Sequence, residues 1–346
     1  MTFMVYRKTS KLRKSASILM VIFATAVLSW QLPVILEGLA SWLGAKSPRL
    51  QVALTSFAAL CVQALPFVLI GSVASATVAV FMTPQRWKKV LPTKSVPAIM
   101  VAAVLGMVVP TCECSSVPLA RRMIKSGVPP SAAVTFMTAA PSLNPLVVIA
   151  TVTAFGGWEM AAARFGAGLL AVVGLGLVVA AFGQQAFAAL TTTDIHEHDQ
   201  EHEHLHGNEH ESKSQKWIHA VWHDAIGAAT FLVLGGAIAA TASAFLPISA
   251  AATVSQQVFV AILVMAIFAV IASLCSLGDA FVAAALVGVH PAGALAFLVV
   301  GPIIDIKLSA MMEGILGSKP TRLIALGGFS TALGTTVIVS ALLGWS

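Results

Sequence analysis

The sequence predicts an all-α polytopic membrane protein with about eight or nine hydrophobic segments of about 20 residues each, arranged as two inverted repeats. Three observations predict this fold: the apolar composition, the spacing of the apolar segments, and the similarity of the two halves. Of the 346 residues, 58% are hydrophobic and 10% are charged, and the mean hydropathy is +0.91. Soluble globular proteins carry about 25% charged residues. Lipid must therefore surround most of the chain, and we exclude a water-soluble enzyme and assign no catalytic residue.

The apolar segments are separated by short polar stretches and by one long hydrophilic gap, Thr191 to Gln215. We interpret the first segment as a retained span rather than a signal peptide, because it is long and no clear small-residue cleavage site follows it. The sequence divides into an N-terminal basic tail with the first transmembrane helix (1–50), a first repeat (51–190), a His-rich loop (191–216) that we expect to be cytoplasmic, and a second repeat (217–346). The segments are 15–36, 52–82, 96–110, 129–155, 160–190, 225–246, 256–274, 291–316 and 322–344.

The two halves resemble each other when the first is shifted by 161 residues, the difference between positions 275 and 114. Cysteines and prolines are uncommon in this chain, so their coincidence carries weight. Duplicated halves of an apolar chain are typical of transporters. The shift pairs Cys114 with Cys275, Ser115 with Ser276, Gly127 with Gly288, Val128 with Val289, Pro130 with Pro291, Ala133 with Ala294, Phe136 with Phe297, Pro141 with Pro302 and Asn144 with Asp305.

The positions of lysine and arginine predict the topology. If every apolar segment crossed the membrane, Arg121, Arg122 and Lys125 would lie opposite Lys88 and Lys89. If 96–126 and its counterpart 256–289 are instead re-entrant hairpins, most basic residues lie on one side, which is then the cytoplasmic side. The two halves acquire opposite orientations, as in inverted-repeat transporters. We therefore expect a multi-pass protein of the inner (cytoplasmic) membrane.

The densest group of polar residues is PTCECSSVPLARRMIKSGVPP, 110–130. Pro110 ends the preceding helix, and we expect Ser115 or Ser116 to cap a short helix with Pro118 in its first turn. Non-helical backbone at membrane depth is tolerated only inside protein or beside a cavity. Thiolates with a carboxylate suit Zn²⁺, Cu⁺ or trivalent arsenic. The alternative is that the cysteines are small buried hydrophobes and that the glutamate caps or gates. The substrate-binding candidates of this segment and its repeat are Cys112, Glu113, Cys114, Ser115, Cys275 and Ser276.

A second helix break is predicted at AAPSLNPLVV, 139–148, where Pro141 and Pro145 bracket Ser142 and Asn144. Its repeat partner is GPIIDIK, 301–307. Two broken helices that meet near the membrane centre would direct their half-helix dipoles at one cavity. We therefore add Asn144 and Asp305 to the substrate-binding candidates. Two proline kinks without a ligand are the alternative.

Ionisable side chains within apolar segments are costly in lipid and should face the protein interior. We expect Asp279 or Asp305 to take up a coupling proton, with Lys307 as a counter-charge; a fixed structural ion pair is the alternative. The ionisable residues considered are Glu113, Asp279, Asp305, Lys307 and Glu313.

The hydrophilic gap carries repeated His-X-His spacing, which suits weak binding of a divalent metal in a flexible loop. The alternative is an ordinary solvated linker. No Walker A motif is present, so this chain does not hydrolyse ATP. No cofactor is required, and no nucleic-acid partner is expected. The candidate metal ligands are His196, His198, His202, His204, His206 and His210.

The segment TCECSSVPLARRMIKSGVPPSAAVTFMTAAPSLNPLVVIATVTAFG resembles the bacterial predicted-permease family that includes the ArsP-type organoarsenical efflux permeases and YraQ-like proteins. The resemblance is strongest over 110–156 and weaker over 275–317. It implies a secondary permease of the cytoplasmic membrane, working in some members with a second membrane or lipoprotein subunit. The matching positions are Cys112, Cys114, Pro118, Gly127, Pro141, Asn144 and Pro145.

Two departures from the family pattern bear on the substrate. Glu113 stands between the cysteines, where family members usually have serine, and the Ser-Leu-Asn-Pro form is closer to uncharacterised members. An arsenical substrate therefore does not follow from the resemblance. The sequence predicts a secondary permease for a small solute such as a soft metal or metalloid compound. The alternative is a non-transporting membrane subunit or metal sensor of a two-component permease complex.

Overall fold

The structure is a computed structural model, and it describes residues 94–109, 113–192, 257–276, 278–286 and 289–345, with scattered residues between 54–92 and 215–237. The predicted span 15–36 and all the loop histidines lie outside the described residues. The predicted spans 52–82 and 225–246 lie mostly outside them. Every regular element in the described part is a helix, so the all-α prediction is confirmed there.

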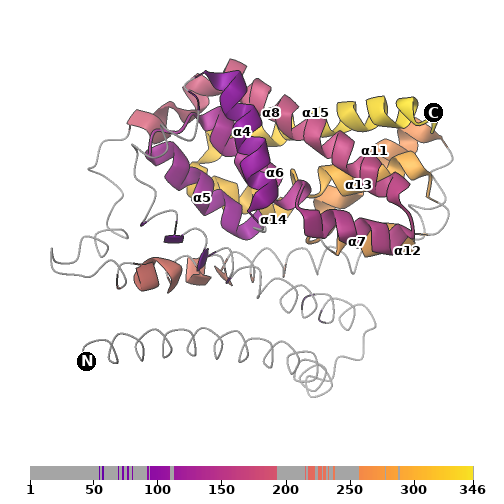
Figure 1. Cartoon of the computed structure of the whole chain (residues 1–346), viewed down its shortest axis with the longest axis horizontal. Helices are drawn as coiled ribbons and strands as arrows, with labels where there is room; N and C mark the ends of the chain where they lie inside the picture. Colours follow the sequence, from indigo (N-terminus) through magenta and orange to yellow (C-terminus); the bar gives the residue numbers. More distant parts are fainter. Residues whose placement is uncertain are drawn as a thin grey trace, which may run out of the picture.

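Ten helices account for the continuously described parts of the chain (Figure 1). Apart from α5 and α12, which lie in the expected hairpin regions 96–126 and 256–289, their bounds follow the predicted apolar segments to within a few residues, and both predicted helix breaks are present. The helices are α4 (Ser95–Val108), α5 (Glu113–Lys125), α6 (Pro130–Ser142), α7 (Pro145–Phe155), α8 (Trp158–Thr192), α11 (Val258–Ala272), α12 (Asp279–Ala285), α13 (Pro291–Val300), α14 (Ile306–Leu316) and α15 (Ser318–Leu342).

In the first half, α6 lies between α4 and α8, and all but the first of its thirteen residues are buried. Small residues permit these close contacts. A Cβ added at Gly106 of α4 would lie 2.6 Å from the Cβ of Ala139, and one at Gly176 of α8 would overlap the Thr135 hydroxyl. The small glycine and alanine residues therefore allow α4 and α8 to pack closely against α6.

The second half repeats this arrangement, with α13 between α11 and α15. Nine of the ten residues of α13 are buried. A Cβ at Gly293 would lie 3.1 Å from both the Cβ and the carbonyl oxygen of Ala261 in α11. Both central helices begin with a proline at the first position, Pro130 and Pro291, where the missing N–H costs no hydrogen bond.

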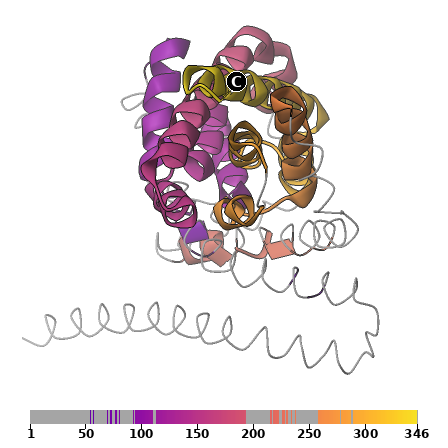
Figure 2. The same ribbon diagram turned by 90° about the vertical axis from the view of Figure 1, so that its right-hand side faces the viewer.

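The halves meet through reciprocal helix contacts. In Figure 2 the purple and magenta helices of the first half lie mainly on the left and the orange helices of the second half on the right, with the yellow α15 at the top; α8 packs along α15. At a shift of 161 residues, α7 (145–155) and α14 (306–316) have the same bounds and the same length. Helix α5 packs against α14, and α12 packs against α7. Exchanging the two halves converts one of these contacts into the other, as expected for a pseudo-two-fold arrangement.

The expected start of α5 is wrong. The helix begins at Glu113, so Ser115 and Ser116 lie inside its first turns, and Pro118 is its sixth residue instead of a first-turn residue. The Ser116 Oγ donates to the Glu113 carbonyl oxygen at 3.0 Å instead of capping the helix. An acidic side chain is favourable in the first turn of a helix, and Glu113 occupies that place.

Three helical stretches in the described part are long and apolar enough to cross a membrane: Pro130–Phe155, Trp158–Ala188 and Ser318–Leu342. Three shorter apolar helices, α4, α11 and α13, have 14, 15 and 10 residues. At about 1.5 Å per residue, each is shorter than the roughly 30 Å hydrocarbon core of a bilayer. The exposed side chains of α8 and α15 are largely apolar, as in Leu170, Phe182 and Leu326. The chain is a membrane protein.

Candidate functional site

The break between α6 and α7 is built by a proline and an asparagine. Helix α6 ends at Ser142, and Asn144 takes extended backbone angles (φ −60°, ψ 136°) before Pro145 starts α7. The Asn144 Oδ1 accepts a hydrogen bond of 2.9 Å from the backbone N–H of Leu146. Because this side chain caps α7, the break needs no water to satisfy the first turn.

Asp305, the repeat partner of Asn144, has the same role at the break between α13 and α14. Its Oδ1 accepts a hydrogen bond from the backbone N–H of Leu308, and its side chain is fully buried. The Ser309 Oγ donates to the Asp305 carbonyl oxygen at 2.6 Å. The two halves therefore solve the same capping problem with an amide in one and a carboxylate in the other. This difference gives the second half a charge that the first lacks.

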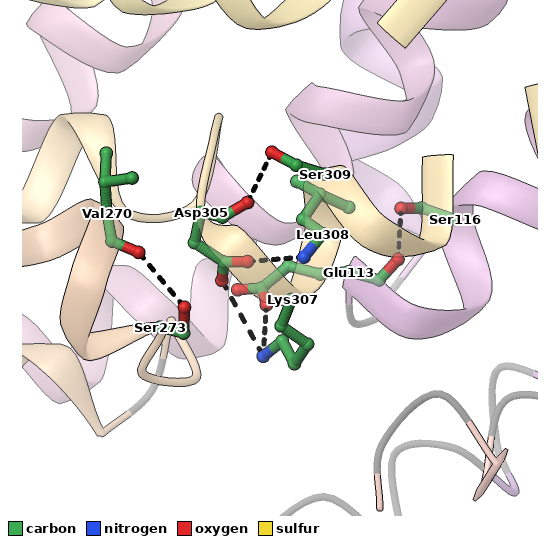
Figure 3. Close-up of polar contacts among 8 residues, drawn as sticks. All are labelled: Glu113, Ser116, Val270, Ser273, Asp305, Lys307, Leu308 and Ser309. Atoms are coloured by element: carbon green, nitrogen blue, oxygen red, sulfur yellow. Dashed lines mark hydrogen bonds and ion pairs between the residues drawn. The ribbon is translucent and has the colours of Figure 1, made fainter. Parts of the chain in front are cut away.

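The α5–α14 junction holds a cluster of three charged side chains (Figure 3). The Lys307 Nζ lies 2.9 Å from the Glu113 Oε2 and 3.8 Å from the Asp305 Oδ2. The side chains are only 2% exposed for Glu113, 7% for Lys307 and 0% for Asp305. Figure 3 shows the two carboxylates directed toward the same ammonium group. One lysine is thus shared by two acids from different halves of the chain.

The α7–α12 region holds the second buried ion pair, formed around Arg164 of α8. Its Nη2 lies 2.8 Å from the Asp279 Oδ2 and donates to the Ser276 carbonyl oxygen at 3.1 Å. Its Nη1 donates to the Thr151 Oγ1 of α7 at 2.9 Å. Because a guanidinium presents its donors in a fixed plane, these contacts tie α7, α8 and the start of α12 together. The geometry favours a fixed structural role for Asp279.

The buried charges do not balance. Taken together, the two clusters, which we call the charged unit, contain three carboxylates and two cations, Arg164 and Lys307, among the described residues. One oxygen of each carboxylate, Glu113 Oε1, Asp279 Oδ1 and Asp305 Oδ2, has no hydrogen-bond partner among the described residues.

Magnitudes show that the excess negative charge needs compensation. A helix N-terminus stabilises a carboxylate by about 0.3–1 kcal/mol, and by about 2 kcal/mol in favourable buried geometry. Burying an uncompensated ion costs several kcal/mol even after the protein relaxes. The helix ends at Glu113 and Asp305 therefore offset only part of the cost. The unit can hold one more positive charge.

The other predicted site residues are only partly placed. Ser115 is buried in α5, and Ser276 is buried in the turn before α12, with Cys275 half-buried beside it. Cys112, the Cys114 side chain and all six loop histidines lie outside what the structure describes. Glu313 is exposed on α14 and takes no part in the cluster. Within the described residues, no group of three or more His, Cys, Asp or Glu side chains could hold a metal ion.

Sequence reasoning missed Arg164 and the pairing of Glu113 with Lys307. Arg164 lies inside the predicted apolar segment 160–190, so its cost in lipid was a signal of an interior partner. The Glu113–Lys307 contact joins opposite halves and is not aligned by the repeat, since the shift places Leu274 opposite Glu113 and Leu146 opposite Lys307. No spacing rule could have found it.

Comparison with known proteins identifies the family. The family model described as "Predicted permease" matches residues 49–344. A Streptococcus mutans protein is 30% identical over 273 residues, 77% of this chain and 87% of its own; its name describes a subunit of a two-component membrane permease complex. The UPF0718 protein YcgR of Bacillus subtilis is 32% identical over 258 residues, 74% of this chain and 86% of its own. No solved structure matches. The chain therefore belongs to this family of predicted membrane permeases.

Proposed function

We propose that this chain is a secondary permease that moves a small solute across the cytoplasmic membrane as a multi-pass protein. The observation that carries the proposal is the buried charged unit at the junction of the two halves. Charged side chains inside apolar segments are costly and usually mark a transport pathway. Here Glu113, Lys307 and Asp305 gather where the first turns of α5 and α14 meet.

The same proposal includes an inverted repeat, with α4–α5 and α11–α12 as re-entrant hairpins. Helices α4 and α11 are short for a full crossing, and α5 and α12 carry or border polar residues. The matching bounds of α7 and α14 support the repeat. Breaks in corresponding positions of two halves are characteristic of secondary transporters with a central binding site.

We assign the solute to the region around the helix breaks. A soft metal or metalloid compound suits thiolate ligands, and the half-buried Cys275 lies in the turn immediately before α12. For coupling we favour Asp305 over Asp279, because the guanidinium of Arg164 holds Asp279. The residues proposed to line the pathway are Cys112, Glu113, Cys114, Ser115, Asn144, Cys275, Ser276 and Asp305.

A second membrane or lipoprotein subunit is a further part of the proposal. The Streptococcus mutans relative, by its name, belongs to a two-component permease complex. The His-rich loop would bind a divalent metal and report its concentration or feed the pathway. A non-transporting subunit or metal sensor is the second candidate function, and it is compatible with that relative's name. If the chain is such a subunit, its deletion and its complementation would change growth only in cells that also contain the partner subunit.

The experiment is a metal and metalloid sensitivity panel on a deletion strain complemented with the wild type, with Cys112→Ala/Cys114→Ala, or with Glu313→Gln as a surface control. We expect wild type and the control to restore growth on at least one of Zn²⁺, Cu⁺ and arsenite, and the double cysteine variant to fail. Identical profiles for wild type and the double cysteine variant would remove the thiol ligands. Identical profiles for wild type and empty vector would remove the permease proposal for these solutes.

A further inference from the structure

We propose that Glu113 and Asp305 share one bound proton beside Lys307, and that this proton is the ion whose movement drives transport. The inference rests on the proposed permease function and names its coupling ion and its second proton-binding residue. It assigns to Glu113 a role in proton binding, and it removes Asp279 from that role. The step is a simple protonation, in which one carboxylate oxygen gains a proton and one buried negative charge disappears.

Among the described residues, the two buried clusters have one carboxylate more than they have cations. Asp279 is paired with Arg164. The same guanidinium also donates to the Thr151 hydroxyl and to the Ser276 carbonyl oxygen, so it makes three hydrogen bonds in all. Glu113 and Asp305 are left to share the single ammonium of Lys307. Like Asp279, each of them also keeps one buried oxygen without a hydrogen-bond partner in the described part of the chain. Because Asp279 is paired with Arg164 while Glu113 and Asp305 share one ammonium, the excess charge lies on these two carboxylates.

A proton fits this place better than a metal ion. Two carboxylates near one another can share a proton, because both cannot ionise without strong repulsion. A hard metal cation takes six or more oxygen ligands, whereas in the described part of this cluster only Glu113 Oε1 and Asp305 Oδ2 have no hydrogen bond. The Lys307 ammonium also faces both carboxylates and repels a metal ion. No metal-sized group of ligands is present among the described residues.

The other ionisable groups on neighbouring helices leave this balance unchanged. Helices α6 and α13, which pack against α5 and α15, contain no ionisable side chain. The basic residues of α5 lie two or more turns from Glu113, at the other end of the helix. The remaining groups on α8, α14 and α15 are exposed and can be screened by solvent: Glu159, Glu313, Lys319 and Arg322.

Protonation would also change which contacts hold the halves together. With the proton on Asp305, Lys307 pairs with Glu113 and joins α14 to α5. With the proton on Glu113, Lys307 can pair with Asp305, which caps the start of the helix that contains Lys307. The contact between α14 and α5 then weakens. Proton position and the α5–α14 contact are thereby linked, as coupling requires.

The test is infrared spectroscopy of the purified full-length protein in nanodiscs, which needs no knowledge of the solute. The carbonyl stretch of a buried carboxylic acid is measured at neutral pH, in sodium and in choline buffers. We expect wild type to show one such group. Glu113→Gln and Asp305→Asn should each lose it, because two carboxylates then face two cations. Lys307→Met should show one more such group than wild type, and Lys307→Met/Glu113→Gln should return to one.

The controls separate the outcomes. Glu313→Gln removes an exposed carboxylate of α14, the helix that carries Lys307, and should leave the carboxylic-acid band unchanged. A band that persists in both Glu113→Gln and Asp305→Asn would overturn the proposal, and so would a band that sodium removes, which would make the site a sodium site. If Lys307→Met does not fold, Lys307→Met/Glu113→Gln removes both members of the 2.9 Å ion pair and still tests the number of protonated carboxyl groups. A missing band in a transport-competent protein refutes the proton site alone. A correct band in a protein that complements no solute sensitivity refutes the permease alone.

Discussion

Glu113, the first residue of α5, and Lys307, in the first turn of α14, form a buried ion pair of 2.9 Å that joins the two halves of the chain. Neither residue has an ionisable counterpart at the repeat-related position, where leucines stand. The contacts α5–α14 and α12–α7 correspond under the 161-residue shift, while the charges at the α5–α14 junction have no counterpart. One lysine is therefore shared by two acids.

Lys307→Met should destabilise the protein far more than Glu113→Gln. Removing the lysine leaves the carboxyl groups of Glu113 and Asp305 without a cation, which costs up to about 5 kcal/mol, part of which the uptake of a second proton recovers. Removing the Glu113 charge leaves Lys307 with Asp305 and should cost about 1 kcal/mol, the value of one hydrogen bond. Thermal unfolding in detergent measures both changes, and equal losses would contradict the shared-lysine account.

Arg164→Met should destabilise the protein by about 3–5 kcal/mol, because it leaves the Asp279 carboxylate buried and unpaired. Arg164→Lys should recover only part of this, because an ammonium cannot reproduce the planar set of bonds to Asp279, Ser276 and Thr151. Lys319→Gln, which removes an exposed cation from α15, serves as the control. The measurement is the unfolding midpoint in the same detergent. Full recovery by lysine would show that charge alone matters at this position.

Asp305→Asn and Asp305→Ala should have different consequences. Asparagine can still accept the hydrogen bond from the Leu308 N–H, so α14 keeps its cap. Alanine loses the cap as well and should cost a further 0.5–2 kcal/mol, about the usual value of an N-cap. We expect both variants to lose the pH dependence of transport and only alanine to lose the cap energy. Transport by Asp305→Asn with unchanged pH dependence would exclude the coupling role.

Gly176→Ala should destabilise the α6–α8 contact, since the added Cβ would overlap the Thr135 hydroxyl and lie 3.1 Å from Ile99 Cγ2. Overpacking of this kind costs about 1–3 kcal/mol. Gly166→Ala in the same helix meets nothing within 4 Å and should be neutral or slightly stabilising. Thermal unfolding of the two variants side by side tests the contact. A neutral Gly176→Ala would show that α6 and α8 are farther apart than described.

Much of the helix layout follows from the sequence. The prolines at 141 and 145 predicted the break that separates α6 from α7, since a proline removes a donor and the next one suits a helix start. The 161-residue shift predicted the second break, and α7 and α14 share their bounds under it. Prolines determine these helix breaks through their effect on the neighbouring backbone, so a short stretch of sequence is enough to predict them.

The charged junction could be predicted only in part. Asp305 and Lys307 were recognised as expensive in lipid, but their partner Glu113 comes from a distant segment and belongs to no repeated motif. Arg164 was overlooked because its neighbours are apolar, although that setting is what requires an interior partner. The start of α5 was misplaced because serines are good caps in general, while here the acidic residue two positions earlier starts the helix. Such tertiary pairings override local preference.

The most direct test of the account is solute uptake by the full-length protein in proteoliposomes, with an imposed proton gradient and an internal pH-sensitive dye. Zn²⁺, Cu⁺ and arsenite are added in turn to liposomes with wild type, Glu113→Gln, Asp305→Asn, Glu313→Gln or no protein. The account predicts that wild type and Glu313→Gln move at least one of these solutes together with protons, and that Glu113→Gln and Asp305→Asn lose the proton movement. Solute movement with equal proton flux in Glu113→Gln and Asp305→Asn, or no difference between wild type and protein-free liposomes, would contradict it.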